Sequence, residues 1–246
     1  RADREIALAA LEQAASSSKL DIDSLLALVD ESLKSDREFM LAVVQKNASA
    51  LNDFDEKFKA DPEIALAAVQ AVGGFSDSED LDLKSDREIV LATVKQDGEA
   101  LQYATEEFKS DREIVLAAVQ DDGLALDYAA DELKADREIV MTAVQQCGRA
   151  LTYASDEFKA DREIVLTAVQ NLGSLANAAE ELQSDREIVL AAVRHGDEME
   201  LFFAAEESRS DREIVLAAVE SHGGALEYAA DELKADREIV LAAVQQ

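Results

Sequence analysis

The tripeptide Asp-Arg-Glu recurs along this chain at a nearly constant interval, and this repeat constrains the fold more than any other feature. Nine copies are intact, and a tenth has Pro in place of Arg. Their first residues are Asp3, Asp36, Asp61, Asp86, Asp111, Asp136, Asp161, Asp185, Asp211 and Asp236. After a first gap of 33 residues, successive copies lie 24 to 26 residues apart. Such a period indicates one small supersecondary unit copied in tandem, with each copy contacting mainly its neighbours.

The copy at 111–135 shows why the unit is predicted to be helical. Its first half, from Asp111 to about Asp122, is apolar around nearly its whole circumference, which is typical of a helix buried on several sides. Its second half, from about Leu124 to Lys134, is apolar on one side, and we expect a second helix there. The sequence therefore predicts an all-α solenoid of tandem helical hairpins of about 25 residues, the last of them incomplete.

A buried strand is the alternative for the run Ile-Val-Leu-Ala-Ala-Val, and would give a solenoid of strands and helices. The β-branched residues favour a strand. The paired Ala residues, the Asp-Pro start at Asp61 and the Gln before the Gly favour a helix. The Leu and Asn ladder of leucine-rich repeats is also missing, so we expect a helix.

Pro62 identifies the residue at which the first helix begins. Pro is favoured at the first helical position, so Asp61 and, by register, the other Asp residues are predicted to be N-caps. The Glu two residues later suits the positive end of the helix dipole. The Arg between them is expected to pair with the Glu of a neighbouring copy. Asp-Arg-Glu is therefore predicted to be a helix start and an inter-repeat ladder.

A Gly follows the first helix in six copies. We expect it to adopt the left-handed conformation that often ends a helix. The residues concerned are Gly73, Gly98, Gly123, Gly148, Gly173 and Gly223.

A second, longer rhythm runs through position 22 of the unit, where Leu and Phe alternate. The residues are Leu33, Phe58, Leu83, Phe108, Leu133, Phe158 and Leu182, followed by Ser208 and Leu233. The alternation predicts a structural period of two copies, about 50 residues, in which adjacent repeats have different surroundings.

Aromatic residues supply the candidate partner-binding positions. All four Tyr share one slot of the unit, with Asn177 and, after a shift of one residue, Phe203 in the same slot of two other copies. Two interpretations are open: packing between repeats, or an aromatic strip for a partner helix or peptide. The candidates are Tyr103, Tyr128, Tyr153, Tyr228, Phe202, Phe203 and Phe75.

The repeat falters in three places, 12–24, 73–82 and 194–203, and any functional site is expected there. The acidic segment 73–82 lacks the Gly and the closing Glu of a calcium loop, and we expect a solvated loop. Residues 1–83 form the divergent repeats, and 84–246 form the regular repeats of the same predicted solenoid.

The charge of the chain restricts the class of partner. The 24 basic and 54 acidic residues give a net charge of −30. A field of that sign repels phosphate backbones and anionic membranes, so we expect no nucleic acid. A basic protein is the expected partner, a divalent cation is also compatible with this charge, and solubility is the alternative explanation of the acidity. No apolar run reaches the ~18 residues of a membrane span.

Residues suited to catalysis are few. His195 and His222 are the only histidines, and no third ligand accompanies them. Cys147 is a lone cysteine without a His in its own repeat, and no phosphate-binding loop is present. Carboxylates recur in every copy, as architectural residues do. We therefore expect no enzymatic activity, cofactor or metal.

The chain begins with Arg1 and stops partway through a repeat at Gln246, so we expect it to be part of a longer protein. It shows no signal-peptide pattern, and its compartment is undetermined.

Four segments of the unit carry a family resemblance: Asp-Arg-Glu-Ile-Val-Leu-Ala-Ala-Val-Gln, the Gly after it, Ala-Leu-x-Tyr-Ala and Glu-Glu-Leu/Phe-Lys. They resemble the tandem repeat called domain of unknown function 4116, closely over 84–246, moderately over 34–72 and weakly before that. Such repeats occur in protist and algal proteins and in some bacterial effectors. The resemblance implies a helical fold and an interaction module, and no catalytic residue.

These observations together favour a non-catalytic protein-interaction scaffold or linker subunit of a larger assembly, with an acidic outer surface. The alternative is an accessory repeat region of a longer enzyme or effector whose catalytic domain lies outside this chain.

Overall fold

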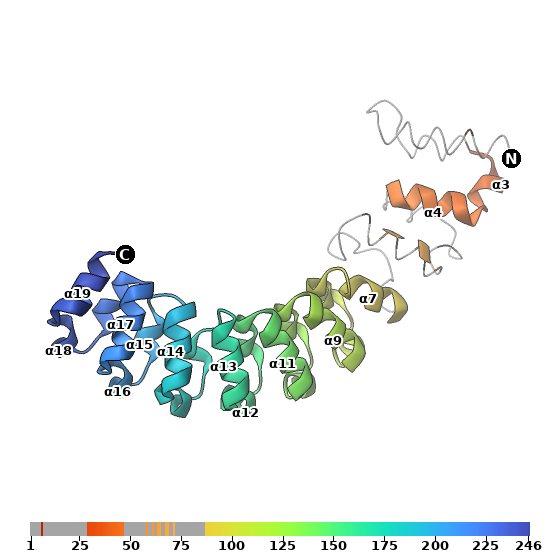
Figure 1. The fold of residues 1–246 in the computed structure, drawn as a ribbon. Coiled ribbons are helices and arrows are strands. Elements are labelled where there is room, and N and C mark those ends of the chain that lie inside the picture. The colour runs from red at the N-terminus through yellow and green to blue at the C-terminus, as the bar shows by residue number, and fades with distance from the viewer. Residues whose placement is uncertain are drawn as a thin grey trace. The chain divides into compact units, whose positions relative to one another are not determined.

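The computed structural model describes residues 29–46 and 87–246, together with Ile6 and seven residues from 58 to 71, namely 58, 61, 63, 64, 67, 68 and 71. These residues form helices, turns and connections, with no strand among them (Figure 1). The predicted all-α repeat fold is confirmed. The chain divides into two compact units, Arg1–Phe108 and Lys109–Gln246. The division into divergent and regular repeats at residue 83 stays a prediction, because 72–86 lie outside the described residues.

The unit Lys109–Gln246 is a stack of repeats, and a regular repeat has a long helix, a 3-10 helix and a one-turn helix (Figure 1). In the first repeat these are α9 (Arg112–Asp121), η5 (Gly123–Tyr128) and α10 (Asp131–Lys134). Each long helix packs against the next. The others are α11 (Arg137–Gln146), α13 (Arg162–Gln170), α14 (Arg186–His195), α17 (Arg212–Ser221) and α19 (Arg237–Val244).

Shorter elements join these long helices. The 3-10 helices are η6 (Gly148–Tyr153), η7 (Leu175–Asn177), η8 (Glu180–Ser184) and η9 (Gly223–Tyr228). The short α-helices are α12 (Asp156–Lys159), α15 (Glu200–Phe203), α16 (Glu206–Arg209) and α18 (Asp231–Lys234). No helix in the described part of the chain combines the length and apolar character that crossing a membrane requires.

The unit Arg1–Phe108 contains the same kinds of element where it is described. They are α3 (Glu31–Lys34), α4 (Arg37–Lys46), α7 (Arg87–Val94) and the 3-10 helix η4 (Gly98–Tyr103), with α8 (Glu106–Lys109) ending at the start of the next unit. One face of α4 is buried in an apolar cluster that also holds Ile64 and Ala68.

The prediction of a continuous second helix from Leu124 to Lys134 is wrong. The segment is a 3-10 helix and a one-turn α-helix, separated by the extended residues Ala129 and Ala130. The extended Ala130 directs its N–H to the carbonyl of Lys109, the last residue of the preceding short helix, at 2.9 Å. The break therefore exposes a backbone donor for bonding between repeats, which a continuous helix would use internally.

This backbone bond recurs from repeat to repeat. Its donors are Ala130, Ser155, Ala179, Ala205 and Ala230, and its acceptors are Lys109, Lys134, Lys159, Gln183 and Arg209, at 2.8–3.0 Å. The short helices are thus tied together by main-chain hydrogen bonds that do not depend on side-chain identity. This explains why the position tolerates both Ala and Ser.

The predicted N-caps are confirmed where the structure describes them, whereas Asp3 and Asp86 lie outside the described residues. In each long helix from α9 to α19, the Asp before the helix accepts hydrogen bonds from the N–H groups two and three residues later. Asp61 does the same toward Glu63 and Ile64. These bonds satisfy donors that a helix end otherwise leaves without partners.

The Arg of Asp-Arg-Glu forms the predicted ladder and contacts one more group than expected. Arg112 reaches both the capping Asp136, at 2.9 Å, and Glu138 of the next repeat. The same double contact is made by Arg37, Arg137, Arg162, Arg186 and Arg212. Pairing with Arg112 lowers the pKa of Asp136 below its ordinary value. One carboxyl group therefore caps its own helix and fixes the preceding repeat.

The left-handed conformation expected of the Gly residues is wrong for Gly123, Gly148, Gly173 and Gly223, none of which has a φ in that region. The residue before Gly123 is extended, with φ −128° and ψ 111° at Asp122. Gly73 lies outside the described residues. Gly is required by close packing instead. A Cβ on Gly123 would lie 2.4 Å from the carbonyl oxygen of Ala143 in the next long helix, and one on Gly148 would lie 2.0 Å from that of Ala168.

The apolar core runs along the stack. The burial of the side chain at position 22 of the repeat alternates with a period of two repeats. Every long helix from α9 to α17 buries its Ile and the apolar residues one, four and five positions after it. Within Lys109–Gln246, position 22 is buried at Phe158 and Ser208 and half-buried at Leu133, Leu182 and Leu233. The alternation of burial continues at Ser208, where the sequence alternation lapses. Adjacent repeats therefore differ in surroundings, as predicted.

Candidate functional site

The repeats depart from their pattern between α13 and α15. Here η7 has three residues where η5 and η6 have six, and the next repeat has the α-helix α15 in place of a 3-10 helix. One residue is missing from the first of these repeats and one is added to the second. The stack is thus irregular at one place while the ladders continue across it.

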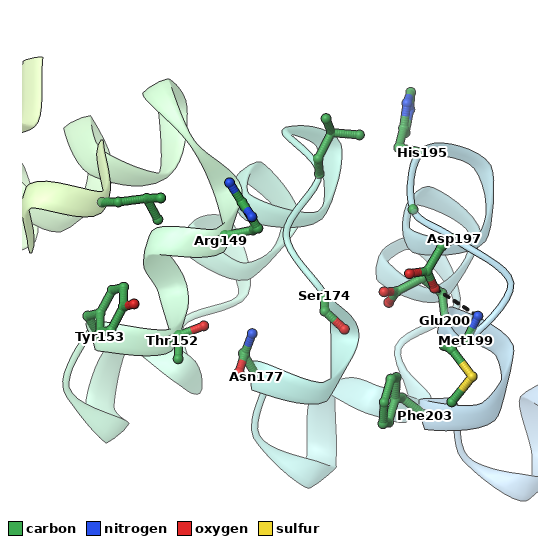
Figure 2. Close-up of a pocket in the computed structure, with 13 residues that line it drawn as sticks. Arg149, Thr152, Tyr153, Ser174, Asn177, His195, Asp197, Met199, Glu200 and Phe203 are labelled. Carbon is green, nitrogen blue, oxygen red and sulfur yellow. Dashed lines mark hydrogen bonds between the residues drawn. The ribbon is translucent and has the colours of Figure 1, made fainter. Parts of the chain in front are cut away.

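An open cleft of about 640 Å³ lies at this place, and we call it the repeat-break cleft. Figure 2 shows Arg149, Thr152 and Tyr153 on one side and the residues of α15 on the other, with Ser174 and Asn177 between them. Its lining is Leu124, Arg149, Thr152, Tyr153, Leu172, Ser174, Asn177, His195, Gly196, Asp197, Met199, Glu200 and Phe203.

Leu172 lies on the rim in an unusual conformation. Its φ is 65°, the left-handed region that a leucine seldom adopts, and its side chain is 68% exposed. The residue missing from this repeat lies just after Leu172, between Gly173 and Asn177, where regular repeats have one residue more. An exposed leucine on a strained backbone is typical of a site under functional constraint.

Glu200 is a buried carboxylate in the wall of the cleft, with only 3% of its surface exposed. Its Oε2 accepts a hydrogen bond from the N–H of Leu175 at 2.7 Å, and the Ser174 side chain is a second partner. Burial raises the pKa of Glu200, and Asp197 adds to this by charge repulsion. A Cβ on Gly196 would lie 2.5 Å from Cγ of Glu200, so Gly196 makes room for this side chain.

Glu200 and Ser174 occupy the same slot of consecutive repeats, three residues before the aromatic position. The other repeats have Ala in this slot: Ala100, Ala125, Ala150 and Ala225. Two polar residues have therefore replaced two neighbouring alanines and hydrogen bond to each other. This pairing reconnects the two irregular repeats where the 3-10 helix is shortened.

The aromatic slot is confirmed as one structural position, at the last residue of the 3-10 helix or of α15. Within Lys109–Gln246 it forms a row, the aromatic row: Tyr128, Tyr153, Asn177, Phe203 and Tyr228. Tyr153, Asn177 and Phe203 line the repeat-break cleft together (Figure 2). Asn177 is the one member without a ring, and it lies between two members that have one.

A cluster of rings adjoins the cleft. Phe202 is 49% exposed. The centroid of its ring lies 5.3 Å from that of Phe203 and 5.5 Å from that of Tyr228, and both pairs pack edge to face. The Tyr228 hydroxyl also donates to the sulfur of Met199 at 3.1 Å. The cleft therefore continues into an aromatic surface on its α15 side.

Charged and titratable side chains of both kinds lie at the cleft. Arg149 and His195 are exposed on its rim, and Asp197 is exposed beside Glu200 (Figure 2). Asp197 accepts a hydrogen bond from the N–H of Met199 at 2.8 Å, which holds the turn before α15.

The described residues hold no group of three or more His, Cys, Asp or Glu arranged for a metal ion. His195 and His222 are both exposed, and Cys147 is half-buried at the end of α11. The expectation that the chain has no metal, cofactor or enzymatic activity stays a prediction.

Some of the candidate residues chosen from the sequence lie at the cleft, and others do not. Tyr153 and Phe203 line the cleft, and Phe202 and Tyr228 form the neighbouring ring cluster. Tyr103 and Tyr128 are half-buried and do not line it. Phe75 and the segments 12–24 and 73–82 lie outside the described residues. Of the three predicted irregular places, 194–203 is the one that the structure shows at the cleft.

Sequence reasoning missed Glu200, Ser174, Leu172 and Arg149. A signal for the first two was present, since a carboxylate and a hydroxyl stand in slots that are otherwise Ala. Leu172 precedes its Gly where regular repeats have Asp, Cys or His, which marks an apolar residue at an exposed turn.

Comparison with protein families gives one result. The family described as Domain of unknown function (DUF4116) matches this chain five times, over residues 36–74, 86–134, 136–177, 161–207 and 211–246. No curated protein and no solved structure shows significant similarity to the chain.

Proposed function

The chain belongs to the DUF4116 family, and on that premise we propose that it is a non-catalytic protein-interaction scaffold whose partner binds at the repeat-break cleft. One observation carries the proposal. Between α9 and α17, the large apolar side chains that are exposed in the described structure are Leu172 and Phe202, and both lie at this cleft or beside it. Exposed apolar residues rimmed by polar ones are typical of a protein interaction site.

The Arg ion-pair ladder and the backbone hydrogen bonds between short helices support a scaffold role. Side chains of a binding site act best when their supporting elements are fixed before the partner arrives, because less ordering is then required on binding. Arg162 and Arg186 join the irregular repeats to each other and to the next one. At the short helices, the backbone bonds from Ala179 and Ala205 join the irregular repeats to the preceding repeat and to each other. The walls of the cleft are thus held from both ends of the repeat.

The charge supports a basic partner. A net charge of −30 attracts cationic proteins over long distances and increases their rate of association at low salt. The carboxylates of the helix starts are occupied by the Arg ladder, whereas Asp197 and Glu198 are exposed next to the cleft. A basic segment that reaches the cleft therefore meets carboxylates that the ladder does not use.

The contacts of Glu200 support a non-catalytic site. General acid–base catalysis requires a group within hydrogen-bond reach of a reacting proton. Both recorded partners of Glu200, Leu175 and Ser174, belong to the neighbouring repeat, and the carboxylate is buried against them. Its place is that of a structural link between repeats.

Site-specific photo-cross-linking in an extract of the source organism tests the proposal. A photo-reactive phenylalanine derivative is placed at Leu172, at Phe202, or at the exposed Gln120 of the regular repeat α9 as a control. We expect adducts at Leu172 and Phe202 that diminish with added salt, and none at Gln120. Equal labelling at all three positions, or none at the first two, would contradict the proposal.

A further inference from the structure

The aromatic row offers a more specific inference, which rests on the proposed function. Tyr153 and Phe203 are separated by one repeat, and Asn177 takes the place of the ring between them. Asn is smaller than Tyr and has no apolar face, so the row is interrupted by a gap. The gap lies within the repeat-break cleft, since all three residues line it (Figure 2).

The shortened η7 enlarges this gap. A regular 3-10 helix has six residues, whereas η7 begins only at Leu175. Gly173 and Ser174, which stand where a regular 3-10 helix begins, belong to the connection instead, and the side chain of Leu172 before them is exposed at the rim. The cleft is thus bounded by two rings and an exposed leucine, with the amide of Asn177 and the hydroxyl of Ser174 between them.

These surroundings suit an aromatic side chain. Rings pack favourably edge to face or offset against other rings, and Met sulfur contacts ring edges. Phe202 already packs in this way on Tyr228 one repeat further on. The polar Asn177 and Ser174 can hydrogen bond to the main chain of an extended segment, or to the polar edge of Tyr or Trp.

Charge determines which residues flank that side chain. On the α15 side the exposed groups are Asp197 and Glu198, and the whole chain carries a net charge of −30. Arg149 lies across the cleft, beside Thr152 and Tyr153, whereas His195 lies above Asp197 on the α15 side (Figure 2). A cationic residue of the occupant is therefore stabilised on the α15 side, and an acidic one is disfavoured there.

We propose that the repeat-break cleft binds an extended segment of a partner protein that inserts an aromatic side chain between Tyr153 and Phe203, above Asn177, and places Lys or Arg beside Asp197. The aromatic side chain completes the interrupted row, and the cation meets the carboxylates of the α15 side. The acidic field brings such a basic segment to the chain, and the gap selects its ring. The occupant is a segment of another protein, whereas a second copy of this chain carries the wrong overall charge for the site.

Selection from a phage-displayed library of random 12-residue peptides tests this inference. We expect enriched peptides to share an aromatic residue with Lys or Arg close to it. Enrichment of acidic peptides, of peptides without an aromatic residue, or of none would overturn the inference. Sedimentation of the chain alone at increasing concentration is the companion measurement, and self-association that is lost in Phe203→Ala would overturn it in favour of a second copy.

Two substitutions at one position locate the binding of the selected peptide. Asn177→Tyr restores the ring of the regular repeats, fills the gap, and should weaken binding at least about tenfold, as loss of an interface anchor does. Asn177→Ala leaves the gap open and should bind within about threefold of the natural chain. Because Tyr is the usual residue of this slot, Asn177→Tyr is expected to fold, which its helical circular dichroism and melting temperature verify. Unchanged peptide binding in Asn177→Tyr would overturn the inference.

The outcomes separate this inference from the proposed function. Cross-linking at Leu172 and Phe202 without peptide selection would leave a partner at the cleft that inserts no ring, and this inference alone would fail. Absence of both cross-linking and peptide binding would remove the proposed function together with it. If the selected peptides bind the natural chain and Asn177→Tyr equally, and the cross-links at Leu172 and Phe202 are still formed, then the partner binds outside the aromatic row.

Discussion

Arg162 Nε lies 2.8 Å from Oδ2 of Asp185, while Oδ1 of the same carboxyl group accepts the N–H groups of Glu187 and Ile188 at the start of α14. One side chain thus caps its own helix and binds the preceding repeat. The two tasks differ in energy. Loss of a cap costs about 0.5–2 kcal/mol, whereas an exposed ion pair is worth about 0–1 kcal/mol.

Three substitutions should separate these tasks. Asp185→Ala loses the cap and the ion pair, and we expect it to lower the free energy of unfolding by about 1–2 kcal/mol. Asp185→Asn keeps an oxygen for capping, and Arg162→Ala keeps the whole cap, so each should cost under about 1 kcal/mol. Urea unfolding followed by circular dichroism measures all three. If Arg162→Ala costs as much as Asp185→Ala, the ion pair and not the cap is the main contribution.

Gly148 should be intolerant of any side chain. A Cβ there would lie 2.0 Å from the carbonyl oxygen of Ala168 and 2.5 Å from the N atom of Gly173, and both neighbours are backbone. Gly148→Ala must therefore move α13 away, at a cost typical of overpacking, about 1–3 kcal/mol or more.

Gly224→Ala is the matched control for Gly148→Ala. Its Cβ would meet only the end of the Glu198 side chain, which can rotate away into solvent. We expect its melting temperature to stay within a few degrees of that of the natural chain. Equal destabilisation by the two substitutions would show that Gly acts through chain flexibility instead of close packing.

Glu200 should give the chain a pH dependence of stability opposite to that of the capping Asp residues. Burial raises the pKa of Glu200, so the folded chain retains a proton that the unfolded chain has released. Its contribution is most favourable at low pH and diminishes as pH rises from the ordinary carboxyl pKa through the raised one. Pairing with Arg162 lowers the pKa of Asp185, whose contribution is present at neutral pH and is lost on acidification.

Glu200→Gln isolates this effect because Gln stays neutral and keeps an oxygen for the Leu175 N–H. We expect Glu200→Gln to gain stability relative to the natural chain as the pH rises from 5 to 8, with Asp197 contributing to the difference by its charge. Glu198→Gln, at an exposed position, serves as the control and should show a smaller change. A constant difference between Glu200→Gln and the natural chain over this range would contradict a raised pKa for Glu200.

Much of the fold could be predicted because it depends on local chemistry. Pro62 identifies Asp61 as a cap, and the apolar pattern after each Asp predicts a buried helix, as the structure confirms. The break at Ala129 and Ala130 could not be predicted in this way, since alanine favours a continuous helix. The two residues are extended because Ala130 bonds to the preceding repeat. Tertiary hydrogen bonding has overruled a local propensity.

The candidate site was predicted less completely for a related reason. An irregular interval is visible in the sequence, and so are the rings at Phe202 and Phe203. The cleft, however, arises because a deletion in one repeat and an insertion in the next are joined through Ser174 and Glu200. Their contact depends on which slots face each other between repeats, and that register is known only from the stack. The need for Gly at position 123 likewise could not be predicted without knowing where the neighbouring helix lies.

Leu172 should show a conflict between stability and binding. Its φ of 65° costs a leucine roughly 1 kcal/mol, and its 68% exposed side chain contributes little burial in return. Asn adopts this conformation more readily, so Leu172→Asn should raise the free energy of unfolding by about 0.5–1 kcal/mol. Leu172→Ala retains the unfavourable φ and should not be stabilised. Both should bind the selected peptide more weakly, because each loses the apolar rim of the cleft.

Urea unfolding and peptide titration on the same three proteins measure the two properties separately. Binding that is unchanged in both variants would remove Leu172 from the proposed site, and stabilisation by Ala as well as Asn would show that exposure of the leucine, and not its backbone conformation, is the source of the cost.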